Sequence, residues 1–160
     1  MYPKWKDKRE ELNLREVGPG IFVGAEKSVT RPPKGGWYAV IDLYGESAAA
    51  THSRMYREVD NLVRWPFFDG DEFPKGLLDM VSGVVRARDK ESGGPILIHC
   101  QAGLSRSASA AYAMLRHYRG LSHEEAHDRV SDDPESWPVS ETLWSARKWV
   151  WKNREEASPE

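Results

Sequence analysis

The segment that most constrains the fold is a continuous apolar run, PILIH, followed by the loop CQAGLS and the stretch RSASAAYAMLRHY. Such a run, without polar alternation, is typical of a strand buried on both faces of a parallel sheet. The stretch after the loop has helical character, and Ala108 and Ala111 give it a small face that can approach the strand closely. We therefore expect a strand, a turn and a helix inside an α/β sheet. The turn lies at the carboxyl end of the strand, where such sheets bind ligands.

The rest of the chain predicts further strands that alternate with helices. Strands are expected at residues 21–24, 37–43 and 61–65, and helices near residues 53–60, 74–88, 105–118, 121–130 and 139–150. The predicted fold class is α/β: a single domain with a central, mostly parallel sheet of four or five strands flanked by helices. We expect residues 1–16 to form a helical extension, residues 17–154 the catalytic domain, and residues 155–160 a disordered tail.

Composition narrows the class of protein. The 160 residues are 39% apolar and 30% charged, with a formal net charge of −2. This balance gives no support for a nucleic-acid or membrane-surface partner, and no segment is long enough to span a bilayer. The N-terminal residues lack the apolar run of a signal peptide. Because a lone cysteine cannot form an internal disulfide, we expect a cytoplasmic location. The sequence leaves the oligomeric state open.

The only cysteine, Cys100, stands where the turn begins. Backbone N–H groups would converge in this turn at a helix N-terminus, which favours anion binding. Arg106 can place a planar guanidinium on two phosphate oxygens, and the same charges stabilise a thiolate. An anion cradle and an activated sulfur in one loop suit phosphoryl transfer to Cys100. The residues expected to bind phosphate are Gln101, Ala102, Gly103, Leu104, Ser105 and Arg106.

HCQAGLSRS resembles the His-Cys-x5-Arg-Ser/Thr signature of protein tyrosine phosphatases, and AGLSRS is the form typical of dual-specificity phosphatases. GPGIFVGA, WYAVIDL and AYAMLRHYRGLSHEEA are similar to further segments of that family. The resemblance covers most of the chain from about Val17, and it implies a fold of the cysteine-phosphatase type. The segment DDPESWPVSETLWSARKW departs from the family pattern. Low-molecular-weight and rhodanese-like phosphatases match less well, in the position of the loop or in its residues.

The resemblance implies a role for each residue of the loop. Cys100 would attack phosphorus, while Arg106 and the loop N–H groups hold the phosphate oxygens. Ser107 would ease departure of the thiolate, and His99 would support the loop and tune the sulfur. The alternative, in which Cys100 only fills the core, does not explain why Gly103, Arg106 and Ser107 follow it at this spacing.

The family also uses an aspartate, from a loop before the cysteine strand, to protonate the leaving oxygen. WPFFDGDEF offers Asp69, Asp71 and Glu72 in that place. Asp69 aligns best with the family's Ile-Pro-x-x-Asp, and Asp71 is the reserve candidate. The alternative is that these acids only solvate a turn.

These assignments predict a phosphomonoester hydrolase. It would act on phosphotyrosine, and on phosphoserine or phosphothreonine, in a phosphorylated protein substrate, through a phosphocysteine intermediate. Two alternatives stay open: a phosphatase of a phosphoinositide, an RNA 5′ end or a phosphoglucan, and a catalytically silent phospho-binding module. No metal or organic cofactor is implied.

Two further patterns have structural explanations. HEEAH, residues 123–127, matches a zinc-protease string, but Ser122 and Glu125 predict a capping box that makes His123 part of an exposed first turn. The last helix carries Trp144, Trp149 and Trp151, for which packing is favoured over a partner surface.

Overall fold

The computed structural model describes residues 13–44, 56, 59–100, 105–131 and 140–157. Five strands form one sheet in the order β1-β2-β5-β3-β4. β2, β5, β3 and β4 run parallel, and β1 pairs with β2 as an antiparallel edge. The single-domain α/β class with a mostly parallel sheet is therefore confirmed. The strands are β1 (Arg15–Gly18), β2 (Ile21–Gly24), β3 (Ala39–Asp42), β4 (Leu62–Arg64) and β5 (Ile96–His99).

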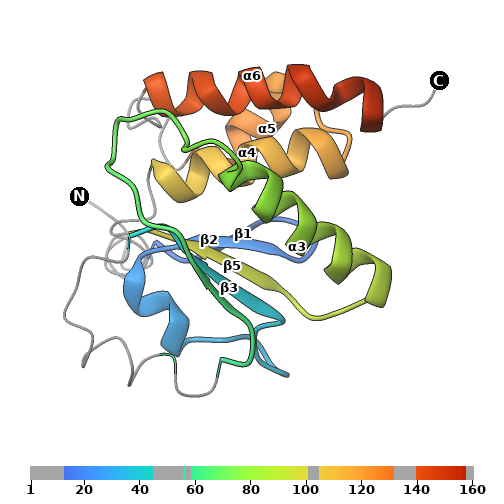
Figure 1. Ribbon diagram of the computed structural model, residues 1–160. Coiled ribbons are helices and arrows are strands. Elements are labelled where there is room, and N and C mark those ends of the chain that lie inside the picture. Colours follow the sequence, from blue (N-terminus) through green and yellow to red (C-terminus); the bar gives the residue numbers. More distant parts are fainter. Residues whose placement is uncertain (1–12, 45–55, 57–58, 101–104, 132–139, 158–160) are drawn as a thin grey trace, which may run out of the picture.

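Helices cover the sheet unequally. Figure 1 shows α3, α4, α5 and α6 above the sheet and the short 3-10 helix η1 below it, with α4 between the sheet and α6. None of the helices in the described part of the chain is long and apolar enough to cross a membrane. The helices are η1 (Glu26–Thr30), α3 (Leu77–Glu91), α4 (Arg106–Tyr118), α5 (His123–Val130) and α6 (Ser140–Ala157).

The unit formed by β5 and α4 lies at the centre of the core, as the apolar run predicts. Every residue of β5 is buried, and its three apolar side chains each contribute about 1.5–3 kcal/mol of hydrophobic stabilisation. Ala108 and Ala111 of α4 are fully buried as well, so the small face of this helix packs inward as expected. This packing fixes the end of β5 and the start of α4, and with them the two sides of the cysteine loop.

Two expected boundaries need correction. Arg15 and Glu16, expected in the helical extension, belong to β1, because Gly18-Pro19-Gly20 makes a tight turn, with Gly20 at φ +74°, that pairs this segment with β2. Residues 155–157, expected in the tail, continue α6, because no glycine or proline interrupts the chain before Pro159. The rest of the extension and most of the helix expected at 53–60 lie outside the described residues.

Candidate active site

The candidate site lies at the carboxyl ends of three adjacent parallel strands. The strand register sets Asp42 of β3 beside His99 of β5 on one side and Arg64 of β4 on the other. Asp42 and His99 are both fully buried. Arg64 Nε donates to Asp42 Oδ2 at 2.9 Å, and the backbone N–H of Tyr44 donates to Asp42 Oδ1 at 2.9 Å. The buried carboxylate is thus paired, as a charge in the core must be.

The His99 ring is held by contacts on both of its nitrogens. Nδ1 lies 3.4 Å from the Cys100 carbonyl oxygen, and because a carbonyl only accepts, Nδ1 carries the proton in that contact. In the neutral ring, Nε2 then accepts from the Tyr56 hydroxyl, 2.6 Å away. Burial, together with the Asp42 charge, raises the pKa of Tyr56 well above its usual range, so the hydroxyl remains a donor. This arrangement fits the supporting role expected for His99.

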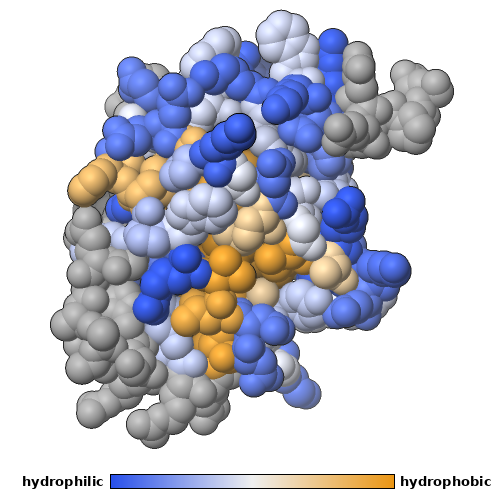
Figure 2. All heavy atoms as spheres, in the orientation of Figure 1, coloured by the Kyte–Doolittle hydropathy of each residue, from blue (hydrophilic) through white to orange (hydrophobic). Residues whose placement is uncertain are grey.

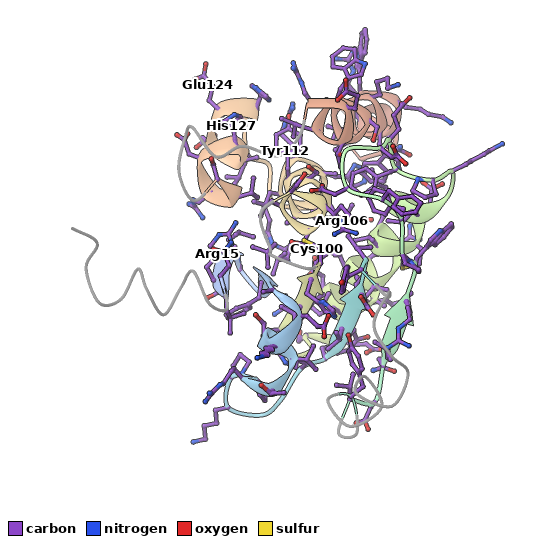
Figure 3. The ribbon with its side chains drawn as sticks, turned by 90° about the vertical axis from the view of Figure 1, so that its left-hand side faces the viewer. Arg15, Cys100, Arg106, Tyr112, Glu124 and His127 are labelled. Carbon is purple, nitrogen blue, oxygen red and sulfur yellow. The ribbon has the colours of Figure 1, made fainter. Side chains whose placement is uncertain are left out.

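Cys100 and Arg106 lie close together where β5 ends and α4 begins (Figure 3), and Ser107 follows Arg106 in the first turn of α4. The Cys100 sulfur lies 3.3 Å from Ser107 Oγ, and both residues are buried. Arg106 is only 6% exposed, and its Nη1 donates to the Phe67 carbonyl oxygen at 2.8 Å. Its guanidinium carbon also lies 5.5 Å from the centre of the Tyr44 ring. The arginine therefore links the cysteine loop to the loop that bears the candidate acids.

Most of the expected phosphate cradle, Gln101, Ala102, Gly103 and Leu104, lies outside the described residues. Ser105 is described: it is buried and occupies the N-cap position of α4. A serine at this position usually accepts a hydrogen bond from the first turn, but the Ser105 side chain makes no such bond. The Ser105 hydroxyl thus does not compete with an anion for the donors at the start of α4.

The acid loop, defined as residues 65–76 between β4 and α3, bends at Asp69. The N–H of Asp71 donates to the Phe68 carbonyl at 3.2 Å, and Gly70 has a φ of +94°, which a glycine adopts without strain. Asp69 and Asp71 are exposed, and Glu72 forms an ion pair outside the site. Phe68 is 71% exposed, and Figure 2 shows apolar surface on the left, where this loop runs.

The HEEAH segment lies on α5, and Figure 3 shows His127 well apart from Cys100. The expected capping box is confirmed: Ser122 Oγ accepts from the Glu125 N–H at 3.1 Å, and the Glu125 carboxylate accepts from the Ser122 N–H at 3.0 Å. His123 Nδ1 lies 2.7 Å from a tyrosine hydroxyl of α4. Burial lowers the pKa of His123 and of His127. Within the described ranges, no three His, Cys, Asp or Glu side chains form a cluster suited to a metal ion.

The tryptophans of α6 divide into two kinds. Trp149 is partly buried against the core, and its Nε1 donates to Asp79 Oδ1 at 2.9 Å, so the packing interpretation is right for this residue. For Trp144 and Trp151 it is wrong, because these residues are 52% and 65% exposed. Each of these two exposed rings carries an arginine guanidinium over its face instead.

A comparison with family models assigns the chain to a family. The model described as "Dual specificity phosphatase, catalytic domain" matches residues 41–146, more than half of the chain. The chain belongs to the dual specificity phosphatase family. The match includes β4, β5, the cysteine loop and the acid loop. The resemblance found in the sequence is therefore confirmed.

The chain is similar to known proteins in sequence and in fold. Human dual specificity protein phosphatase 2 is 51% identical over 41 residues, which cover 26% of this chain and 13% of that protein's length. The structure of the human tyrosine phosphatase-like serine/threonine/tyrosine-interacting protein has a TM-score of 0.70 and 17% identity, covering 88% of this chain and 97% of that one. The structure of PTPMT1 in complex with PI(5)P has a TM-score of 0.68 and 17% identity, covering 91% and 99%. These structures share the fold.

Sequence reasoning missed three residues of the site: Asp42, Arg64 and Tyr56. The available signal for Asp42 was an acid at the end of an otherwise apolar strand, where burial requires a partner. Nothing in the sequence identified Arg64 as that partner, because the pairing depends on strand register.

Proposed function

We propose that this protein is a cysteine-dependent phosphatase that removes phosphate from phosphotyrosine, and from phosphoserine or phosphothreonine, in protein substrates. The observation that carries the proposal is the buried contact of Cys100 with Ser107, beside a buried guanidinium, at the N-terminus of α4. The Nε of Arg106 is also buried, and it donates to no other residue that the structure describes. Donors arranged in this way suit a phosphate dianion.

The reaction that fits these residues has two steps. In the first, the Cys100 thiolate attacks phosphorus, the bond to the leaving oxygen breaks, and Asp69 gives that oxygen a proton. In the second, Asp69 takes a proton from water, the water oxygen bonds to phosphorus, and the phosphorus–sulfur bond breaks. Ser107 then donates a hydrogen bond to the departing thiolate. Arg106 and the N–H groups of residues 101–106 would hold the remaining phosphate oxygens through both steps.

The geometry of the acid loop favours Asp69 over its neighbours as the acid. Arg106 holds the loop at the Phe67 carbonyl, two residues before Asp69. Glu72 is paired with Lys148 of α6 at 2.6 Å, and the Asp71 carbonyl accepts a hydrogen bond from α6. Asp69 therefore follows the contact with the phosphate-binding arginine, whereas the side chain of Glu72 and the backbone of Asp71 are part of the contact with α6.

A non-protein substrate is the second candidate, and one observation supports it. PTPMT1, which shares the fold, has been solved in complex with PI(5)P, so a phosphorylated lipid headgroup fits this kind of site. The silent-module alternative is less well supported, since Cys100, Arg106 and Asp69 are all present. Because the mechanism needs a reduced sulfur, we also propose a reducing, cytoplasmic location.

Phosphate release from phosphotyrosyl, phosphoseryl and phosphothreonyl peptides and from phosphoinositide vesicles, for wild type and Cys100→Ser, tests the proposal. We expect turnover of the peptides by the wild type and none by Cys100→Ser, because a serine hydroxyl is a poor nucleophile in this position. Turnover of vesicles alone would select the lipid candidate. Vanadate binding without turnover of any substrate would select the silent module, and Cys100→Ser within tenfold of wild type would refute the cysteine mechanism.

Asp69→Asn provides the matching test of the acid, with Asp71→Asn as its control on the same loop. We expect Asp69→Asn to slow alkyl phosphates by about 10²–10⁴ and to flatten the basic limb of the pH–rate profile, since a poor leaving group needs the proton most. If Asp71→Asn gives this selectivity and Asp69→Asn does not, the acid is Asp71.

A further inference from the structure

Two hydrogen bonds join side chains of α6 to the backbone of the acid loop, one on each side of Glu72. Thr142 Oγ1 donates to the Asp71 carbonyl oxygen at 2.7 Å, and the Phe73 N–H donates to Ser145 Oγ at 2.9 Å. Three residues further along α6, Lys148 forms the ion pair with Glu72. Residues three apart lie on the same side of a helix, so one face of α6 makes all these contacts. Figure 1 shows the acid loop rising from the sheet to the start of α6 before it enters α3.

The burial of the two hydroxyl groups separates them from ordinary surface contacts. Thr142 is fully buried and Ser145 is 9% exposed. A buried hydroxyl is costly unless it is hydrogen-bonded, and both residue types form helices less well than alanine. Packing of α6 against the core would be served equally well by apolar side chains. What the hydroxyl groups provide is a fixed position for the backbone of the acid loop.

The loop is held at a second point. Arg106 donates to the carbonyl of Phe67, and α4, which begins at Arg106, packs against α6. Asp69 lies between these attachments, with Phe67 on one side and the Asp71–Phe73 segment on the other. Because both attachments lead back to α4, the phosphate-binding arginine and the candidate acid share one rigid support.

We propose that Thr142 and Ser145 are positioning residues for the general acid Asp69, a role that rests on the proposed function above. They hold the C-terminal side of the Asp69 turn, so that the carboxyl group stays within hydrogen-bond reach of the leaving oxygen. A general acid acts only within that reach, and a misplacement of about 1 Å can cost roughly 10²-fold in rate. Loosening the far end of the loop therefore weakens proton donation while the cysteine and arginine stay in place.

The test compares good and poor leaving groups in Thr142→Val, Ser145→Ala and the double variant. Thr142→Val keeps the shape of the side chain and removes the donor, and Ser145→Ala removes the acceptor. For the double variant we expect kcat/KM to fall about tenfold with an alkyl phosphate and less than about twofold with p-nitrophenyl phosphate, because an alkoxide needs the proton most. The basic limb of the pH–rate profile should flatten in the same variant.

Trp149→Phe is the matched control. It removes one hydrogen bond made by α6, but that bond reaches Asp79 of α3 and not the acid loop. Its ratio of alkyl to p-nitrophenyl activity should equal that of the wild type. Thr142→Ser keeps a hydroxyl, so it should keep the ratio of the wild type as well; a loss there as large as in Thr142→Val would overturn the positioning role.

A folded double variant that keeps the wild-type ratio, or loses activity equally with both substrates, would also refute the inference. If the double variant fails to fold, Ser145→Ala alone decides, since it deletes one atom at the edge of the core. Failure of the proposed function is distinguishable, because either the wild type would then turn over none of the phosphate esters or Cys100→Ser would retain turnover.

Discussion

The hydroxyl of Tyr56 offers the sharpest test of the buried network behind the cysteine. Tyr56→Phe removes one oxygen atom and leaves the ring, which is 7% exposed, in place. The hydroxyl is 2.6 Å from His99 Nε2. In the variant this nitrogen loses its donor in a site that water does not reach, since His99 is fully buried.

The burial of His99 determines how much stability the variant loses. A hydrogen bond contributes about 0.5–1.5 kcal/mol net, but a buried acceptor left without a partner costs about 1–3 kcal/mol. We expect the free energy of unfolding of Tyr56→Phe to fall by the larger amount, because the Asp42 carboxylate, 3.7 Å from Nε2, is an acceptor and cannot replace the lost donor. In a domain of this size each kcal/mol lowers Tm by roughly 2–4 °C.

Urea unfolding of the wild type and the variant, followed by tryptophan fluorescence, measures this difference. Tyr38→Phe is the control, because it also removes a tyrosine hydroxyl that is hydrogen-bonded, here to Glu91 at 2.7 Å, but on the surface. We expect Tyr38→Phe to cost less than about 0.5 kcal/mol. If the two variants are equally stable, the contact between Tyr56 and His99 does not hold the cysteine strand as described.

Three further predictions follow from the site and its surroundings. Arg106→Lys should lower kcat/KM by about 10²–10³, because an ammonium group cannot hold Phe67 and a phosphate together as the guanidinium does; a steady-state assay with near-normal kcat/KM would contradict this. Burial alone would raise the pKa of Asp89, but hydrogen bonds from Arg119 and Arg88 outweigh this effect and lower the pKa. The ionised Asp89 therefore stabilises the fold above about pH 4, and this stabilisation is lost as the pH falls through the lowered pKa. The difference in the free energy of unfolding between wild type and Asp89→Asn, measured in urea, should therefore become smaller in acid. A difference that does not change with pH would refute this. Orthovanadate should inhibit turnover and EDTA should not, because each proposed step belongs to a side chain; activity lost to chelator and restored by Zn²⁺ would make HEEAH a metal site.

The centre of the fold could be predicted because its signals are local. PILIH reads as a buried strand from its own residues, and β5 is that strand. The small residues of α4 and the capping box of α5 are equally local, and both were found where expected. The prediction of an anion loop from Cys100 to Arg106 is local in the same way, since it rests on seven consecutive residues, one of them a glycine, and needs no knowledge of the partners around them.

The support of the acid loop could not be predicted in this way. WPFFDGDEF shows where acids are available, but the residues that hold the loop come from a helix far away in the sequence. Thr142 and Ser145 have no periodic signature, because a hydroxyl inside a helix reads as a weak helix former until its partner is known. The segment that contains them also departs from the family pattern, so the resemblance gave no help with it.

The charges at the ends of the strands show why register matters to function. A buried carboxylate on the strand beside Cys100 would repel a phosphate dianion if it stood alone. Asp42 does not stand alone, since the same register that sets it beside His99 also sets Arg64 against it. The pair is close to neutral as a unit, and Arg64, which is 38% exposed, reaches it from the solvent side. Arg106 Nη1 donates to the neutral Phe67 carbonyl, so the positive charge of Arg106 would remain available for the phosphate of the proposed reaction.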